Sequence, residues 1–223
     1  MNNIVKDVSE MLSFRTKFET LKIVIEELYL IALTDSYKRL THIPEINLLS
    51  ENKIRNKIQY DFEHNNKHIS EYIQNETITF NSESQIVTEE NETYRTDIKL
   101  YCRWYGRSFV FECKKFNPSN YGYIKGHYDK EKGKFVYNGI ERFTELIYAE
   151  KDRYAGMIGF VCSGKIDKII QNLKPKIINF KLVKNSKDLL DRKCVNWKFS
   201  FQSIHNRENN TEIHLYHLFF DFT

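Results

Sequence analysis

Residues 94–116 contain the side chains of this chain that are best suited to do chemistry. Within this segment the only acidic residues are Asp97 and Glu112, fifteen positions apart, and Lys114 lies two residues beyond Glu112. Two carboxylates can share a metal ion only at short range, because Mg²⁺–oxygen distances are about 2.0–2.1 Å. Any joint chemistry of Asp97 and Glu112 therefore depends on how the local backbone brings them together.

The flanking residues predict a β-hairpin. Residues 97–102 and 108–113 are rich in β-branched and aromatic side chains, and Gly106 stands between them. Side chains alternate between the two faces of a strand, so Glu112 and Lys114 share one face of the predicted sheet.

The register of this hairpin decides the distance between the two acids. A two-residue loop at 106–107 would place Asp97 opposite Phe116, on the face of Glu112 but about 13 Å along the strand from it. A longer loop would place Asp97 directly opposite Glu112. A bulge or splayed strands would also shorten the distance. The sequence leaves these alternatives open.

A carboxylate inside an apolar strand needs a physical reason. Glu112 follows the apolar run 109–111, where an unpaired buried charge would be costly. One explanation is a salt bridge with Lys114, Arg95 or Lys99 on a solvated sheet face. The other is a site that uses Asp97, Glu112 and Lys114 together.

The order of Asp97, then Glu112-x-Lys114 in the next strand, resembles the motif of the PD-(D/E)XK nuclease superfamily. The resemblance is best over about residues 45–165, and Thr96 stands where the motif has proline. It implies an α/β fold with a restriction-endonuclease-like mixed central sheet flanked by helices. To this core the sequence adds an N-terminal helix and a C-terminal β-hairpin.

The resemblance also implies an activity, the Mg²⁺- or Mn²⁺-dependent hydrolysis of phosphodiester bonds by an endodeoxyribonuclease. Asp97, Glu112 and the backbone carbonyl of Cys113 would hold the metal through hard oxygen ligands. Lys114 would orient or deprotonate the attacking water, or neutralise developing charge. Stand-alone nucleases of this kind resemble restriction endonucleases and the nuclease effectors of bacterial antiphage defence.

An early helix carries a further acid in the superfamily. Residues 50–62 form an amphipathic pattern with Ser50 as a plausible N-cap. Glu51 would supply the helix acid, with Glu63 as the other candidate. The alternative for Glu51 is a first-turn carboxylate that the helix dipole favours.

Apolar periodicity predicts the remaining elements and a single domain. Its core spans about residues 45–165, preceded by a helical extension (1–44) and followed by a C-terminal helix and strands (166–223). The expected elements are helices over 18–32, 139–150 and 166–173, the last stopped by Pro175; a doubly buried strand over 155–162; a strand over 177–183; and a hairpin of 197–202 with 213–220.

Composition bounds the setting of the protein. The chain has 223 residues, a net charge of +4 and no apolar run near the ~20 residues of a membrane span. It lacks a signal-peptide pattern, and its four cysteines form no CxxC pair, so a cytoplasmic protein with reduced thiols is expected. No membrane is an expected partner.

Charge is more informative locally than globally. Residues 95–134 hold ten basic and four acidic side chains, which suits a polyanionic backbone such as DNA. Lys115, Arg107 and Lys125 are the candidate contacts to nucleic acid, and a solvated lysine-rich surface is the alternative. A homo-oligomer or a recruiting partner protein stays open. The rival function is a non-catalytic nucleic-acid-binding or scaffold protein that retains the nuclease fold.

Overall fold

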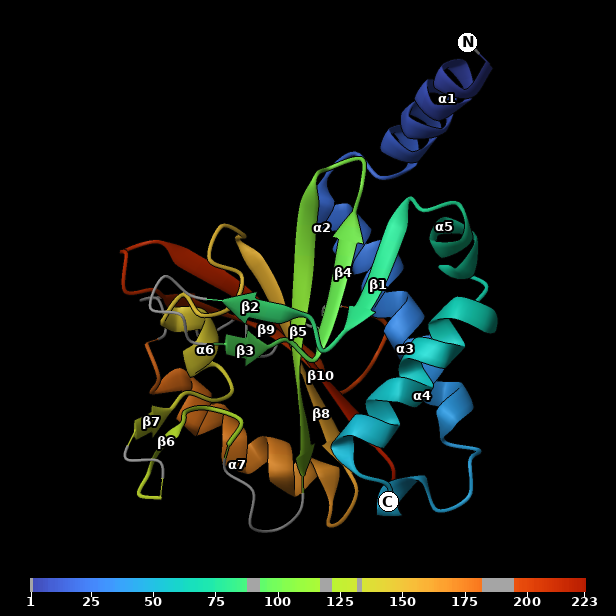
Figure 1. Ribbon diagram of the computed structural model, residues 1–223. Coiled ribbons are helices and arrows are strands. Elements are labelled where there is room, and N and C mark those ends of the chain that lie inside the picture. Colours follow the sequence, from blue (N-terminus) through green and yellow to red (C-terminus); the bar gives the residue numbers. More distant parts are fainter. Residues whose placement is uncertain (1, 88–92, 117–121, 132–133, 182–194) are drawn as a thin grey trace.

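A mixed six-stranded sheet forms the centre of the protein (Figure 1). The computed structural model describes residues 2–87, 93–116, 122–131, 134–181 and 195–223. Strands β1, β4 and β5 pair antiparallel, β8 and β10 continue parallel to β5, and β9 closes the sheet antiparallel to β10. In spatial order the strands are β1 (Ile78–Ser82), β4 (Ile98–Cys102), β5 (Arg107–Phe116), β8 (Tyr154–Val161), β10 (Glu212–Asp221) and β9 (Ser200–Asn206).

Helices cover both faces of this sheet (Figure 1). One face carries α2 (Leu21–Ile23), the π-helical segment η1 (Val24–Tyr29), α3 (Leu30–Leu40), a 3₁₀ turn η2 (Ile46–Leu48), α4 (Glu51–His64) and α5 (Ser70–Gln74). The other face carries α6 (Glu141–Thr144) and α7 (Ile166–Ile178). Helix α1 (Asn2–Lys17) projects from the body, and two small hairpins, β2 (Gln85–Val87) with β3 (Thr93–Arg95) and β6 (His127–Asp129) with β7 (Lys134–Val136), lie apart from the main sheet.

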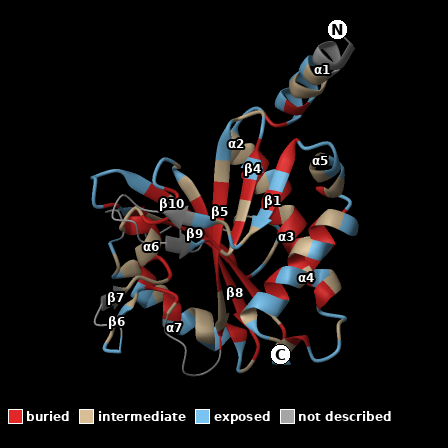
Figure 2. Cartoon of the chain, in the orientation of Figure 1, coloured by how far each residue is buried: buried red, intermediate tan, exposed pale blue. Residues whose placement is uncertain are grey.

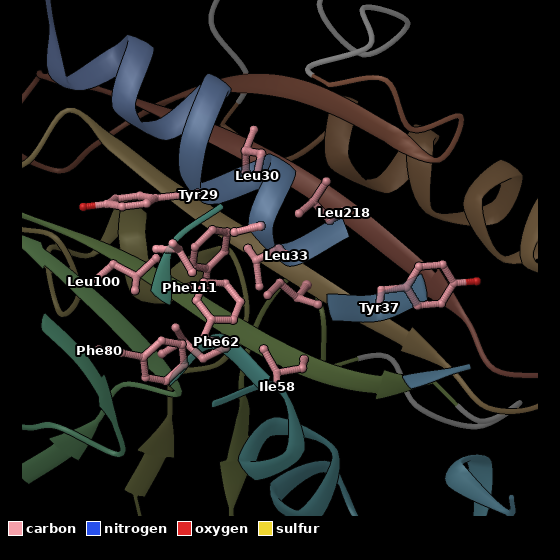
Figure 3. Packing of buried hydrophobic residues seen from close by; sticks show 14 of the residues in the cluster. Tyr29, Leu30, Leu33, Tyr37, Ile58, Phe62, Phe80, Leu100, Phe111 and Leu218 are labelled. Atoms are coloured by element: carbon pink, nitrogen blue, oxygen red, sulfur yellow. The ribbon is translucent and has the colours of Figure 1, made fainter. Parts of the chain in front are cut away.

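Alternation along β5 creates two separate hydrophobic cores. Phe109 and Phe111 pack against α3 and α4, where Figure 3 shows Phe111 among side chains such as Leu33 and Phe62. Val110 packs in the core under α6 and α7. Figure 2 shows that the central strands are buried along most of their length. The sheet is therefore a rigid platform whose polar side chains need specific partners.

Several predicted elements are confirmed. Helix α4 begins after Ser50, whose side chain accepts a hydrogen bond from the backbone N–H of Lys53. The hairpin of β4 with β5, the buried strand β8 and the terminal hairpin of β9 with β10 also match the predictions. The chain is thus an α/β protein with N-terminal helices, a mixed sheet and a C-terminal hairpin.

The N-terminal helix is longer than the predicted range 18–32. Thr20 caps α2 by accepting a hydrogen bond from the N–H of Ile23, and the helical segment continues through η1 and α3 to Leu40. The core against α3 and α4 includes side chains from Phe14 to Phe222. The N-terminal extension, the predicted nuclease-like core and the C-terminal strands therefore share one hydrophobic core.

Three predictions of secondary structure are wrong. The helix expected over 139–150 is only α6, because Leu146 (φ 61°) and Ala149 (φ 53°) adopt left-handed backbone conformations. Helix α7 continues through Pro175 to Ile178, and Ile177 in its last turn is buried in the hydrophobic core. Residues 177–181 do not form the strand expected over 177–183, and residues 182 and 183 lie outside the described part.

Two further expectations concern membranes and thiols. Within the described residues, no helix is long and apolar enough to span a membrane. Cys102, Cys113 and Cys162 are free and buried, as predicted, whereas Cys194 lies outside the described residues.

Candidate active site

The β4–β5 register answers the question that the sequence left open. Ile98 pairs with Phe111 and Cys102 pairs with Arg107, so the next position along β4 places Asp97 opposite Glu112. The connecting turn spans residues 103–106, with a hydrogen bond from the N–H of Gly106 to the carbonyl of Arg103. The two-residue loop is therefore wrong, and the longer loop is the one that forms.

Asp97 is held from two directions. Its Oδ2 accepts a hydrogen bond from the backbone N–H of Cys113 at 2.7 Å, and its Oδ1 accepts one from Nη1 of Arg55 at 2.6 Å. Arg55 is only 2% exposed and comes from α4, and its Nη2 pairs with Glu83 in the turn between β1 and β2. The carboxylate is thus fixed between a helix and the backbone of β5.

Glu112 is completely buried and carries two cationic partners. Nζ of Lys114 lies 2.6 Å from its Oε1, and Nη1 of Arg142 lies 3.0 Å from both of its oxygens. The salt bridge to Lys114 exists, yet Glu112 does not lie on a solvated sheet face. Arg95 instead pairs with Glu83.

Arg142 links the two carboxylate-bearing strands through Tyr148. Its Nη1 donates to the hydroxyl of Tyr148 at 2.6 Å, and that hydroxyl donates to the backbone carbonyl of Arg95, two residues before Asp97. The guanidinium of Arg142 also lies over the Tyr148 ring, 5.0 Å from its centroid. This pair ties the position of Glu112 to the end of β3, just before Asp97.

Glu51 reaches the same end of β5 from the first turn of α4. Its Oε2 accepts a hydrogen bond from the backbone N–H of Lys115 at 2.6 Å. Glu63 lies twelve residues further along α4, about 18 Å away at 1.5 Å per residue, and its side chain bonds to Gln59. Of the two candidates for the helix acid, only Glu51 adjoins the motif.

The electrostatics join these residues into one cluster. Burial lowers the pKa of Lys114, but the negative charges of Glu112, Glu51 and Asp97 outweigh it, so the pKa is raised overall. Burial and then the charge of Glu112 raise the pKa of Asp97 to about 7, while Lys114 and the N–H of Cys113 act in the opposite direction. The charges of Glu112 and Glu51 therefore act on the ionisation of both Asp97 and Lys114.

The donor chemistry of this cluster fits a hard divalent cation. Asp97 and Glu112 supply carboxylate oxygens, and the carbonyl of Cys113 lies between Glu112 and Lys114 in the chain. Among the described residues, no three His, Cys, Asp or Glu side chains form a ready-made metal cage. A cation here would be held by two carboxylates and a backbone oxygen, in competition with Lys114 and Arg142 for Glu112.

The three predicted contacts to nucleic acid occupy different places. Nζ of Lys115 donates to the carbonyls of Asn47 at 2.8 Å and Leu49 at 2.6 Å, so this ammonium fastens the segment before α4 to β5. Arg107 is exposed at the opposite end of β5, about 17 Å from Glu112 at ~3.3 Å per residue. Lys125 is exposed on the α7 side.

Sequence reasoning missed three residues of the cluster: Arg55, Arg142 and Tyr148. Arg55 could have been found, because it follows Glu51 by four positions and therefore lies on the same face of α4. Arg142 and Tyr148 come 30 and 36 residues after Glu112, and nothing in their spacing points to Glu112.

The fold and the cluster define an α/β protein with a buried carboxylate–lysine site at the junction of α4, β4 and β5. No protein-family model, curated protein or solved structure matches the chain.

Proposed function

We propose that this protein is a metal-dependent nuclease of the PD-(D/E)XK type that hydrolyses phosphodiester bonds in DNA. The observation that carries the proposal is the register that sets Asp97 opposite Glu112, with Lys114 and Glu51 in the same cluster. A salt bridge on a sheet surface would require neither this register nor a helix acid.

The order of the elements supports the same proposal. Helix α4 is followed by the antiparallel strands β1, β4 and β5, and the chain then crosses α6 to β8, which lies parallel to β5. A restriction-endonuclease-like core has this order of helix, three antiparallel strands, helix and parallel strand. The small hairpins and the pair β10–β9 are additions to that core.

Each residue of the cluster has a distinct role in the proposal. Asp97, Glu112 and the Cys113 carbonyl would hold Mg²⁺ or Mn²⁺, which supplies Lewis-acid polarisation of the phosphate and activation of water. Lys114, with its raised pKa, stays charged and orients water or neutralises charge on the phosphate rather than acting as a base. Glu51 adds a third carboxylate beside Asp97 and Glu112. A role in restriction or antiphage defence is the expected setting.

The first test is plasmid cleavage by purified protein with Mg²⁺, Mn²⁺ or EDTA. Nicking or linearisation should require the metal, and Asp97→Ala and Lys114→Ala should each reduce it by on the order of 10²-fold or more, because both remove charge at the reacting phosphate. Glu51→Gln should also reduce cleavage. Glu63→Gln on the same helix is the matched control and should cut like the wild type.

A non-catalytic DNA-binding protein is the second candidate. Arg55, Lys114 and Arg142 already neutralise the two carboxylates without a metal, as they would in a site that had lost catalysis. In that case no metal supports cleavage, Asp97→Ala leaves DNA affinity unchanged, and calorimetry with Mn²⁺ shows no binding that depends on Asp97.

A further inference from the structure

A pocket lies between the segment 122–127, which leads into β6, and the end of α7. Figure 1 shows the β6–β7 hairpin and α7 on the same side of the sheet. Its volume is about 540 Å³, within the ~300–1,000 Å³ of pockets that hold small ligands. One wall comes from the segment 122–127 and the other from the end of α7. The lining residues are Gly122, Ile124, Lys125, Gly126, His127, Lys176, Asn179 and Phe180.

A chain of buried hydrogen bonds joins the two walls. The carbonyl of Phe180 can only accept, so Nδ1 of His205 donates to it at 2.7 Å. Neutral His205 then accepts at Nε2 from the hydroxyl of Ser203 at 2.7 Å.

The same chain continues to the opposite wall. The Ser203 oxygen accepts from Nε2 of His217 at 2.7 Å, and Nδ1 of His217 accepts from the hydroxyl of Tyr123 at 2.8 Å. Ser203, His205 and His217 are fully buried. Both walls are thereby preformed, since each ends on a network whose donors and acceptors are all satisfied.

Close backbone contacts fix the 122–127 wall as well. A Cβ on Gly126 would lie 1.8 Å from the carbonyl oxygen of Val136, so only glycine fits there. The N–H groups of Ile140 and Glu141 donate to the carbonyls of Tyr123 and Ile124. The loop is therefore tied to the start of α6.

The chemistry of the lining selects an anion with a flat apolar part. Lys125, His127 and Lys176 are the basic or protonatable side chains of the lining, and none of the described lining residues is acidic. Ile124 and the half-buried Phe180 supply apolar surface, and Asn179 supplies an amide. We infer that this pocket binds a nucleotide, with Phe180 and Ile124 against the base and Lys125 at the phosphate.

The pocket is connected to the proposed active site by a short path. The N–H of Gly126 donates to Oε2 of Glu141 at 2.7 Å, and the next residue, Arg142, contacts both oxygens of Glu112. The pocket loop is thus hydrogen-bonded to the sequence neighbour of Arg142, which is the partner of Glu112. The pocket's use as a subsite for the cleaved strand rests on the proposed nuclease function, whereas nucleotide binding does not.

The test is calorimetric titration of the 223-residue chain in EDTA, where a metal-dependent nuclease does not cleave. AMP and dAMP should bind saturably, adenosine and inorganic phosphate should each bind more weakly, and Lys125→Gln should weaken AMP binding about tenfold by removing one charged contact. Lys168→Gln, on α7 but outside the pocket lining, is the matched control and should leave the affinity unchanged.

Competition identifies the source of the nucleotide. A short single-stranded oligodeoxynucleotide that displaces AMP assigns the pocket to a nucleic-acid strand, and one that does not displace it assigns the pocket to a free nucleotide. Absence of saturable AMP or dAMP binding, or an equal loss in Lys168→Gln, overturns the inference. Plasmid cleavage is measured separately, so failure of the nuclease proposal leaves this result readable.

Discussion

At the scale of single residues, the candidate site is a balance of three acids against three cations. Glu112 has no exposed surface, and a buried carboxylate is tolerated only when it is paired and hydrogen-bonded. Lys114 and Arg142 provide that pairing, and Arg55 provides it for Asp97. A metal ion at this site would therefore compete with these protein cations for the carboxylates, because the negative charge is already neutralised.

The ionisation of Asp97 should respond to Arg55. Loss of the ion pair in Arg55→Met removes a charge that favours the carboxylate, so the pKa of Asp97 should rise above its value of about 7. Carboxyl ¹³C chemical shifts recorded against pH in metal-free protein measure this. Lys38→Met, whose ammonium pairs with Asp35, is the control and should leave the titration of Asp97 in place.

The raised pKa of Asp97 has a defined effect on stability. Because the folded-state value lies above the ordinary value of 3.8, Asp97 contributes stability that is fully present below pH 3.8 and is lost as the pH rises through about 7. The residue is thus least favourable for folding at the pH at which it would bind a metal.

Tyr148 and Arg142 should act as positioning residues. Tyr148→Phe leaves the Arg95 carbonyl and Nη1 of Arg142 without the hydroxyl, at a cost of about 1–3 kcal/mol in the free energy of unfolding. Urea denaturation measures the loss, and Tyr60→Phe, at an exposed tyrosine, should cost almost nothing. Equal effects of the two variants would contradict the role of the hydroxyl.

In a cleavage assay the same variant should lower kcat more than it raises KM for DNA. The reason is that the Tyr148 hydroxyl contacts Arg142 and the Arg95 carbonyl, which hold the two carboxylates in place. A change confined to KM would contradict a positioning role.

The motif residues could be predicted because their geometry is local. One hairpin and the first turn of one helix decide where Asp97, Glu112 and Glu51 lie, and the sequence signals both elements, although it left the register of the hairpin open. Arg142 and Tyr148 come from a segment whose path depends on left-handed residues, and such a path has no periodicity. Their contacts arise from tertiary structure alone.

At the scale of elements, predictions succeeded where local signals agreed and failed where tertiary packing overrode them. Helix α4 has a cap, a stripe of apolar residues and a defined first turn. Helix α7 runs past Pro175 because Leu173 and Ile177, four residues apart, both lie in the hydrophobic core under α7. Burial of Ile177 keeps the last turn helical despite the proline.

The buried histidines of the terminal hairpin should make the protein sensitive to acid. Burial lowers the pKa of His205 to about 4 and that of His217 well below its ordinary value. Between pH 6.5 and about 4 the unfolded chain binds protons that the folded chain does not, so stability falls as the pH falls.

Urea unfolding at a series of pH values tests this behaviour. His205→Gln should lower the dependence of the unfolding free energy on pH by about 1.4 kcal/mol per pH unit within this window. The comparison with wild type removes the contribution of Asp97, which has the opposite sign. An unchanged slope would show that His205 is not neutral in the folded protein.

At the scale of the whole molecule, aromatic side chains pack tightly against a glycine in the central strand β8. A Cβ on Gly159 of β8 would lie 2.6 Å from the Phe219 ring and 2.7 Å from the Phe116 ring. Two rings from the neighbouring strands β10 and β5 thus close over one glycine. The packing of all three strands depends on that position.

Gly159→Ala should therefore destabilise the protein by about 1–3 kcal/mol through overpacking. Combining it with Phe219→Leu should cost less than the sum of the two single variants, because the smaller side chain makes room for the methyl group. Denaturation of the four proteins in a double-mutant cycle gives the coupling, and strict additivity would contradict the contact.

The strand order also determines when the central sheet can be completed during synthesis of the chain. Strand β10 is the last strand along the described chain, yet it lies in the interior of the sheet between β8 and β9. Until residue 221 has left the ribosome, β8 has an open edge, and the core against α3 and α4 lacks Leu218 and Phe220. A nascent chain therefore carries the whole Asp97–Lys114 motif long before it can hold that motif in a finished sheet. A chain whose synthesis stops before residue 221 would thus carry the motif residues on an unfinished sheet, so the candidate site is assembled only after β10 has been made.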